Sequence, residues 1–141
     1  MPTERNSIIL DTNLWISFLL MKDYSKLDKI FSNNLLTLLF SEELLNEFIE
    51  VAKRPYFNKY FSLSDLKELL MQIRNSAEFI NVISNVKVCR DPKDNFLLAL
   101  AKDGKADYLL SGDKHLLELK KFGKTKIITI TGFFDEMKNN S

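Results

Sequence analysis

The stretch Ser7-Ile8-Ile9-Leu10-Asp11 decides the fold, because it joins an apolar run to an acid at the point where the run ends. Residues 107–110 and 127–130 contain further short runs that are almost continuously apolar. Strands of this kind are typical of parallel sheets that are covered on both faces. The three runs therefore predict the centre of a parallel sheet between two layers of helices.

Helical patterns alternate with such runs along the chain. Strands are predicted at 7–10, 35–40, within 81–88, at 107–110 and at 126–130, and helices at 14–20, 42–53, 64–75, 92–103, 114–121 and the C-terminus. Alternating strands and helices favour parallel pairing through right-handed crossovers. We therefore expect a three-layer α/β/α sandwich with a central, mostly parallel sheet. No repeat or linker-like stretch divides residues 1–141, which predicts a single domain.

Composition excludes several classes of protein. The 141 residues are 45% hydrophobic and 28% charged, as in globular chains. A single cysteine, Cys89, excludes an internal disulfide, and a single histidine, His115, excludes a Cys/His zinc site within the chain. The net charge of +1 argues against binding to nucleic acid by bulk positive charge alone. With neither a signal-like start nor a membrane-spanning run, the expected location is the cytoplasm.

Acids follow three of the predicted strands. Asp11 ends the first strand, Asp94 follows the run at 86–88, and Asp113 follows the strand at 107–110. The carboxyl ends of parallel strands meet at one edge of a sheet, where α/β folds bind ligands. Their common location at this edge favours a functional site.

Each acid also has a purely structural interpretation. Aspartate between a strand and a helix is a favoured N-cap, and Asp91, which precedes Pro92, is assigned mainly to that role. Asp94 suits the reciprocal position of a capping box, but it also lies on the inward face of its helix. Asp107 is placed at the start of a strand, at the opposite end from the site, and is left out of it.

A fourth acid comes from the helix at 42–53. At 100° per residue, Glu47 borders the apolar stripe of that helix, where alone it would be a surface carboxylate. Four carboxylates brought together raise each other's pKa, and Mg²⁺ or Mn²⁺ relieves that conflict with oxygen coordination. A metal held in this way can activate water against a phosphodiester. Phosphodiester hydrolysis therefore suits this set of acids best.

Four segments resemble the motifs of the PIN-domain family (named from the PilT N-terminus) and, more narrowly, VapC-like ribonucleases, the toxin components of bacterial toxin–antitoxin systems. The segments, in this order, are 8–13 (IILDTN), 41–47 with 54–55 (SEELLNE, RP), 89–95 (CRDPKDN) and 106–114 (ADYLLSGDK). The resemblance spans about residues 8–134. It implies catalytic, metal-binding acids at Asp11, Glu47, Asp94 and Asp113, supported by polar side chains at Asn13 and Ser111.

The same resemblance implies an activity and partners. The expected function is a Mg²⁺- or Mn²⁺-dependent endoribonuclease that acts as the toxin of a pair, with RNA as substrate, a cognate antitoxin and a homodimeric state common in the family. His115 departs from the pattern, since the subgroup usually has aspartate there. The alternative is a catalytically inactive PIN-fold module that binds RNA or protein.

Two basic stretches are candidates for RNA contact. Residues 114–126 contain five lysines and one acid, and Lys53, Arg54 and Lys59 follow Glu47. We predict that phosphates are contacted by Lys53, Arg54, Lys114, Lys120 and Lys121. The aromatic residues at helical spacing, Trp15 and Phe18 among them, are interpreted as core rather than as platforms for bases.

Overall fold

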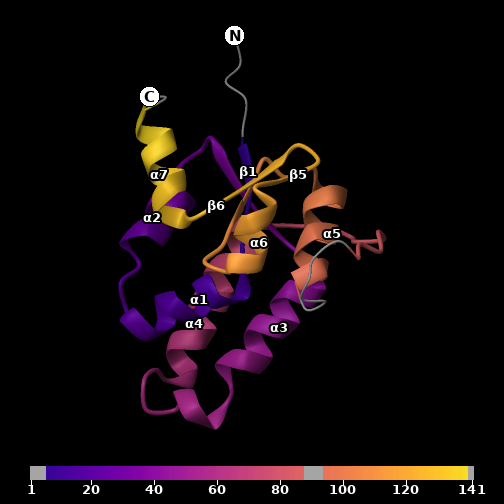
Figure 1. Cartoon of the computed structure of the whole chain (residues 1–141). Coiled ribbons are helices and arrows are strands. Elements are labelled where there is room, and N and C mark those ends of the chain that lie inside the picture. Colours follow the sequence, from indigo (N-terminus) through magenta and orange to yellow (C-terminus); the bar gives the residue numbers. More distant parts are fainter. Residues whose placement is uncertain (1–5, 88–93, 140–141) are drawn as a thin grey trace.

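The computed structural model describes residues 6–87 and 94–139, and it contains a six-stranded sheet in the order β3-β2-β1-β4-β6-β5 (Figure 1). The strands are β1 (Asn6–Leu10), β2 (Leu36–Phe40), β3 (Glu78–Phe79), β4 (Tyr108–Leu110), β5 (Lys121–Phe122) and β6 (Thr125–Ile128). Every neighbouring pair is parallel except β5 with β6. The mostly parallel sheet is thus confirmed.

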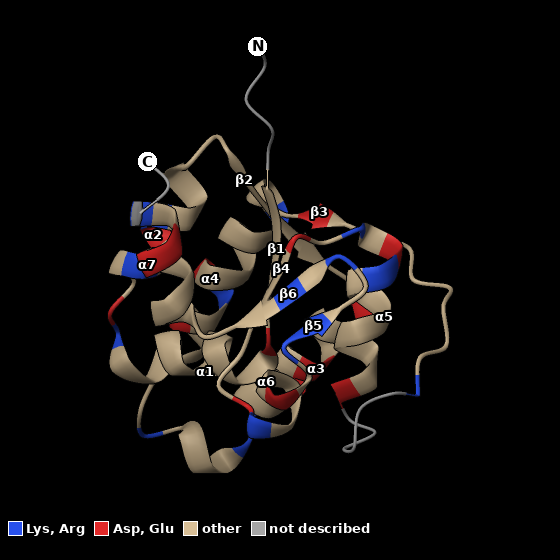
Figure 2. Cartoon of the chain, turned by 45° about the horizontal axis from the view of Figure 1, so that its top comes forward, with Lys and Arg blue, Asp and Glu red and all other residues tan. Residues whose placement is uncertain are grey.

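Helices cover both faces of this sheet, as the three-layer prediction requires. They are α1 (Thr12–Met21), α2 (Ser25–Ser32), α3 (Glu42–Ala52), α4 (Leu63–Ser76), α5 (Asn95–Gly104), α6 (Lys114–Leu119) and α7 (Ile130–Asn139), with a 3₁₀ turn at Pro55–Phe57. In both views α2 and α7 lie on one side of the sheet and α3 and α5 on the other (Figures 1 and 2). Within the described ranges, no helix is long and apolar enough to cross a membrane.

The core forms around the central strands because their side chains are apolar on both faces. Ile8, Ile9 and Leu10 of β1 are completely buried, as are Leu109 and Leu110 of β4. Burial of each such side chain contributes about 1.5–3 kcal/mol. The aromatic residues Trp15 and Phe18 are also buried, as predicted, and the rings of Trp15 and Phe40 lie 5.3 Å apart.

The strand predicted within 81–88 is wrong for the residues that can be compared. Residues 81–87 contain no strand, and Val88 lies outside the described ranges, as do Asp91 and Pro92. The backbone amides of Ile83 and Ser84 donate to the Asp103 carboxylate at 2.7 and 2.8 Å, and so are not left for a neighbouring strand. The third strand along the chain is instead β3, which pairs with the end of β2.

Two further elements were not predicted. Helix α2 is short, and only Leu27 and Ile30 mark its buried face. Strand β5 contains Lys121, which the sequence pattern predicts as the last residue of the helix at 114–121. The chain turns there through Gly123, whose φ of +60° is readily adopted by glycine, and returns as β6.

Candidate functional site

The candidate site lies where the chain changes direction across the sheet. From β1 the chain passes to β2 on one side, whereas β4 leads to β6 on the other, so β1 and β4 flank a topological switch point. Leu10 and Leu110 are paired at the ends of these strands, and the Asp11 amide donates to the Leu110 carbonyl at 3.1 Å. Parallel sheets bind ligands beyond the carboxyl ends of the strands at such points.

Asp11 is buried at this position, with 3% of its surface exposed. Its Oδ1 accepts a hydrogen bond from the Leu14 amide at 3.0 Å, so the side chain caps α1. Its Oδ2 accepts a hydrogen bond from the Ser111 hydroxyl. Capping therefore occupies one oxygen of Asp11, while the other faces the loop that follows β4.

Ser111 links Asp11 to Asp113. The Ser111 hydroxyl is buried, donates to Asp11 and accepts a hydrogen bond from the Asp113 amide at 2.9 Å. Asp113 in turn caps α6, because its Oδ1 accepts from the amides of His115 at 2.7 Å and Leu116 at 3.4 Å. One hydroxyl thus fixes the loop that carries the second acid.

The electrostatics of Asp11 reflect this placement. Burial raises the pKa of the Asp11 carboxyl above its usual value, and the nearby charge of Asp113 raises it further. Hydrogen bonds from Ser111 and from the Leu14 amide lower the pKa and partly offset these effects. A cation beside the two acids would favour the ionised form of Asp11.

Two buried polar atoms lie next to these acids in sequence without a partner among the described residues. They are the Thr12 hydroxyl oxygen and Nδ1 of His115. Buried polar atoms are nearly always satisfied by protein, water or an ion. The donor set of two carboxylates with unsatisfied polar neighbours therefore suits a hydrated, hard divalent cation.

The other two predicted acids are positioned by separate helices. Glu47 is half-buried on α3, which packs against α1, and Asp94 is half-buried at the N-cap of α5. Within residues 6–87 and 94–139, no group of three or more acids, histidines or cysteines is close enough to hold a metal. Asn13 is exposed, whereas the adjacent Thr12, which the sequence reasoning passed over, is buried.

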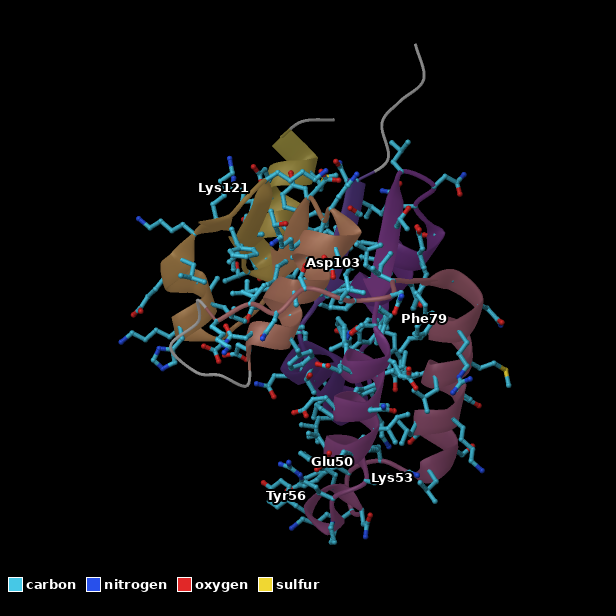
Figure 3. The ribbon with its side chains drawn as sticks, turned by 90° about the vertical axis from the view of Figure 1, so that its right-hand side faces the viewer. Glu50, Lys53, Tyr56, Phe79, Asp103 and Lys121 are labelled. Atoms are coloured by element: carbon cyan, nitrogen blue, oxygen red, sulfur yellow. The ribbon has the colours of Figure 1, made fainter. Side chains whose placement is uncertain are left out.

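The predicted RNA-contacting residues fall into two groups at different ends of the molecule. Lys53 and Arg54 are exposed just beyond α3, and Lys114 is exposed next to Asp113. Lys121 of β5 lies far from Lys53 in Figure 3, and Lys120 immediately precedes β5 in the chain. Figure 2 shows Lys and Arg residues in blue along β5 and β6.

Lys120 and Lys121 line a hollow of about 490 Å³ at the amino edge of the sheet, opposite the acids. Two other lysines of this hollow are ion-paired, Lys124 with Asp107 at 3.3 Å and Lys126 with Glu136 at 2.6 Å. Asp107 also accepts a hydrogen bond from the Ser7 amide at the start of β1. Its place at the amino edge agrees with its exclusion from the candidate site.

Comparison with known proteins gives the family. Residues 7–115 match the model of the PIN domain, whose members are generally nucleases that use divalent metal ions and bind nucleic acid. The chain is also similar to an uncharacterised protein of Methanocaldococcus jannaschii, with 29% identity over 117 residues that cover 80% of this chain and 74% of the relative. No solved structure matches the chain significantly. The matched residues include residues 7–10 of β1, the switch point and both linked acids, and the chain belongs to the PIN-domain family.

Proposed function

We propose that the protein is a Mg²⁺- or Mn²⁺-dependent endoribonuclease that hydrolyses phosphodiester bonds in single-stranded or looped RNA. The observation that carries this proposal is the buried carboxylate of Asp11, whose pKa is raised by burial and by Asp113 at the switch point of a PIN fold. An unneutralised pair of acids there is costly for folding alone, and a divalent cation removes that cost.

The acids are assigned as the metal ligands. Asp11 and Asp113 form the fixed part of the set, and Glu47 and Asp94 complete it from α3 and α5. When bound, the metal ion would polarise the phosphodiester and lower the pKa of a bound water. Ser111 holds Asp11 in position through its hydroxyl, and Asn13, at the exposed start of α1, would orient a carboxylate or a metal-bound water.

A biological role follows from the more specific resemblance. We propose that the nuclease is the toxin of a toxin–antitoxin pair in the cytoplasm and that its antitoxin blocks the acid site. The apolar side chains of Leu66, Leu69 and Ile73 on α4 are buried in the core, so they are not available for a homodimer contact. Light scattering tests the oligomeric state, because a monomer has a mass of 16.4 kDa.

RNA cleavage tests the proposed activity. The purified chain is expected to cleave single-stranded RNA with Mg²⁺ or Mn²⁺, and to lose this activity in EDTA or when carrying Asp11→Asn. Cleavage that persists under both conditions would identify a contaminating nuclease. The toxin role has its own test: expression should arrest growth, and co-expression of a small neighbouring gene that encodes the antitoxin should relieve the arrest.

A PIN-fold binding module without turnover is the second candidate. It is favoured by the finding that, within the described ranges, no three acids lie close enough to hold a metal. RNA binding by the native chain without cleavage in any divalent metal would support the module and contradict the nuclease.

A further inference from the structure

Residues 53–62, between α3 and α4, form a projection that carries exposed aromatic rings. Tyr56 and Tyr60 are 66% and 40% exposed, and their ring centroids lie 5.8 Å apart. Exposed large rings contribute little to the core, and two of them in contact indicate a surface for binding a ligand or a partner molecule. We call this surface the tyrosine platform; it consists of Tyr56, Tyr60 and Lys59.

The platform is held in place from beneath. Phe57 packs edge-on against Tyr56, with centroids 5.1 Å apart, and stacks on Phe61 at 5.7 Å and 22°. Phe61 is buried, with 8% of its surface exposed. Backbone hydrogen bonds from the amides of Phe57, Tyr60 and Phe61 close successive turns of the segment. The backbone that carries the exposed rings is therefore held in place before any ligand arrives, which limits the entropy lost on binding.

Positive charge accompanies the rings. Lys59 Nζ lies 6.0 Å from the Tyr56 ring and 5.3 Å from the Tyr60 ring, within the range of a cation–π contact. Lys53 and Arg54 precede the platform, and no acid occurs between residues 51 and 64. Aromatic faces beside cations are a combination that binds single-stranded nucleic acid.

Helix α3 connects the platform to the candidate site. It begins at Glu42, after its N-cap Ser41 and the end of β2 at the carboxyl edge of the sheet, and passes Glu47 on its way outward. From Glu47 to Lys53 the helix rises by roughly 9 Å. Figure 3 shows Lys53 and Tyr56 together beyond the end of α3, with Glu50 beside them. A strand of a few nucleotides would therefore span from the acids to the rings.

We propose that the tyrosine platform stacks unpaired bases of the single-stranded RNA substrate, with Lys53 and Arg54 contacting the adjacent phosphates. This subsite rests on the proposed nuclease function and deepens it, because stacking on both tyrosines requires bases that are not paired. It makes the enzyme select single-stranded over duplex RNA at a point several nucleotides from the bond that is cut.

Binding of a short RNA that contains 2-aminopurine tests the platform. All proteins carry Asp11→Asn in the full chain, so that RNA is bound without being cut. The double variant Tyr56→Ala/Tyr60→Ala should bind the single strand about 5- to 100-fold more weakly, and should quench 2-aminopurine fluorescence less. The matched control Tyr56→Phe/Tyr60→Phe keeps both rings and should bind as the parent does. If the double alanine variant fails to fold, Tyr56→Ala alone removes the more exposed ring and gives the same readout.

Salt dependence separates the rings from the charges. Loss of the tyrosine rings should leave the slope of affinity against salt unchanged, whereas Lys53→Gln should reduce it by about 0.7, as for one phosphate contact on a single strand. Equal RNA affinity and equal quenching in parent and double alanine variant would overturn the platform and leave it as a protein-contact surface. Absence of both cleavage and RNA binding by the native chain would instead overturn the proposed function.

Discussion

The two edges of the sheet place aspartates in opposite surroundings. At the carboxyl edge, Asp11 is buried beside a second acid, and its pKa is raised. At the amino edge, Asp107 is half-exposed and paired with Lys124 at 3.3 Å. The charge of Asp107 is satisfied by the protein itself, whereas that of Asp11 calls for a partner from solution. The difference separates an acid that supports the fold from one suited to binding a cation.

The largest expected effect tests this difference directly. Asp113→Asn should lower the rate of RNA cleavage by ~100-fold or more, because it removes a group that stabilises the reacting centre electrostatically. Asp107→Asn makes the same chemical change at the other edge and should retain activity within a few-fold. Cleavage rates for both variants, measured at saturating Mg²⁺, check the pair. Equal losses in the two would break the distinction between the edges.

A buried hydroxyl at each edge gives the next comparison. Ser111→Ala should weaken apparent Mg²⁺ or Mn²⁺ affinity by about 10- to 100-fold, because the hydroxyl orients Asp11. The Thr125 hydroxyl is also buried and donates to the Ala106 carbonyl at 2.6 Å, but at the amino edge. Thr125→Val should cost stability and leave the metal dependence of cleavage unchanged. Metal titrations of activity distinguish the two results.

The lysines of the amino edge are expected to have a smaller effect. Lys120→Glu/Lys121→Glu should reduce RNA affinity several-fold and flatten its salt dependence, since exposed lysines contact phosphate without fixing the reacting bond. Lys26→Glu/Lys29→Glu makes the same charge change on α2 and serves as the control. Binding measured across a range of salt concentrations decides the matter. If both double variants lose RNA affinity equally, the loss comes from net charge alone and Lys120 and Lys121 do not contact phosphate specifically.

Stability should show the smallest change, and in the opposite direction to activity. The folded state binds the Asp11 proton more tightly than the unfolded chain, because the pKa of this carboxyl is raised above 3.8. The contribution of Asp11 to stability is therefore greatest below that value and is lost as the pH rises from 3.8 through the raised pKa.

At pH 7 without metal, Asp11→Asn should accordingly raise the melting temperature by a few degrees, as expected for a gain of ~1 kcal/mol. Saturating Mg²⁺ should stabilise the parent and have little effect on the variant. Thermal melts with and without metal test both expectations. A variant that melts well below the metal-free parent would mean that the capping hydrogen bond of Asp11 outweighs its charge.

The sequence predicted β1 and β4 well because their consecutive apolar residues are buried on both faces, as Ile8, Ile9 and Leu10 are. Strand β6 was predicted from Ile127 and Ile128, although Lys126 within it is exposed. The edge elements were harder, since β3 and β5 have two residues each. Strand β3 pairs with β2, which lies far earlier in the chain, and β5 forms a very short hairpin with β6. The interaction of Asp103 with residues 83 and 84 is a tertiary contact that no local pattern reveals.

The candidate site was predictable where it depends on the central strands and not where it depends on tertiary contacts. Asp11, Ser111 and Asp113 follow predicted strands, and the rule that parallel strands end together placed them at one edge. The buried hydroxyl of Thr12 was passed over because a threonine at the start of a helix carries no sign of its burial. Lys121 lies at the amino edge because β5 pairs with β6 there. The sequence pattern instead predicts Lys121 at the end of a helix, so this location was not foreseen.

Trp15 gives the molecule a built-in optical reporter. It is the one tryptophan of the chain, it is fully buried, and its indole Nε1 donates at 3.1 Å to the carbonyl of Leu10, the residue before Asp11. Emission excited at the red edge of the absorption band therefore comes from a ring joined to the backbone of the acid site. Loading of a cation beside Asp11 can be followed through this emission in the unlabelled protein, independently of any RNA.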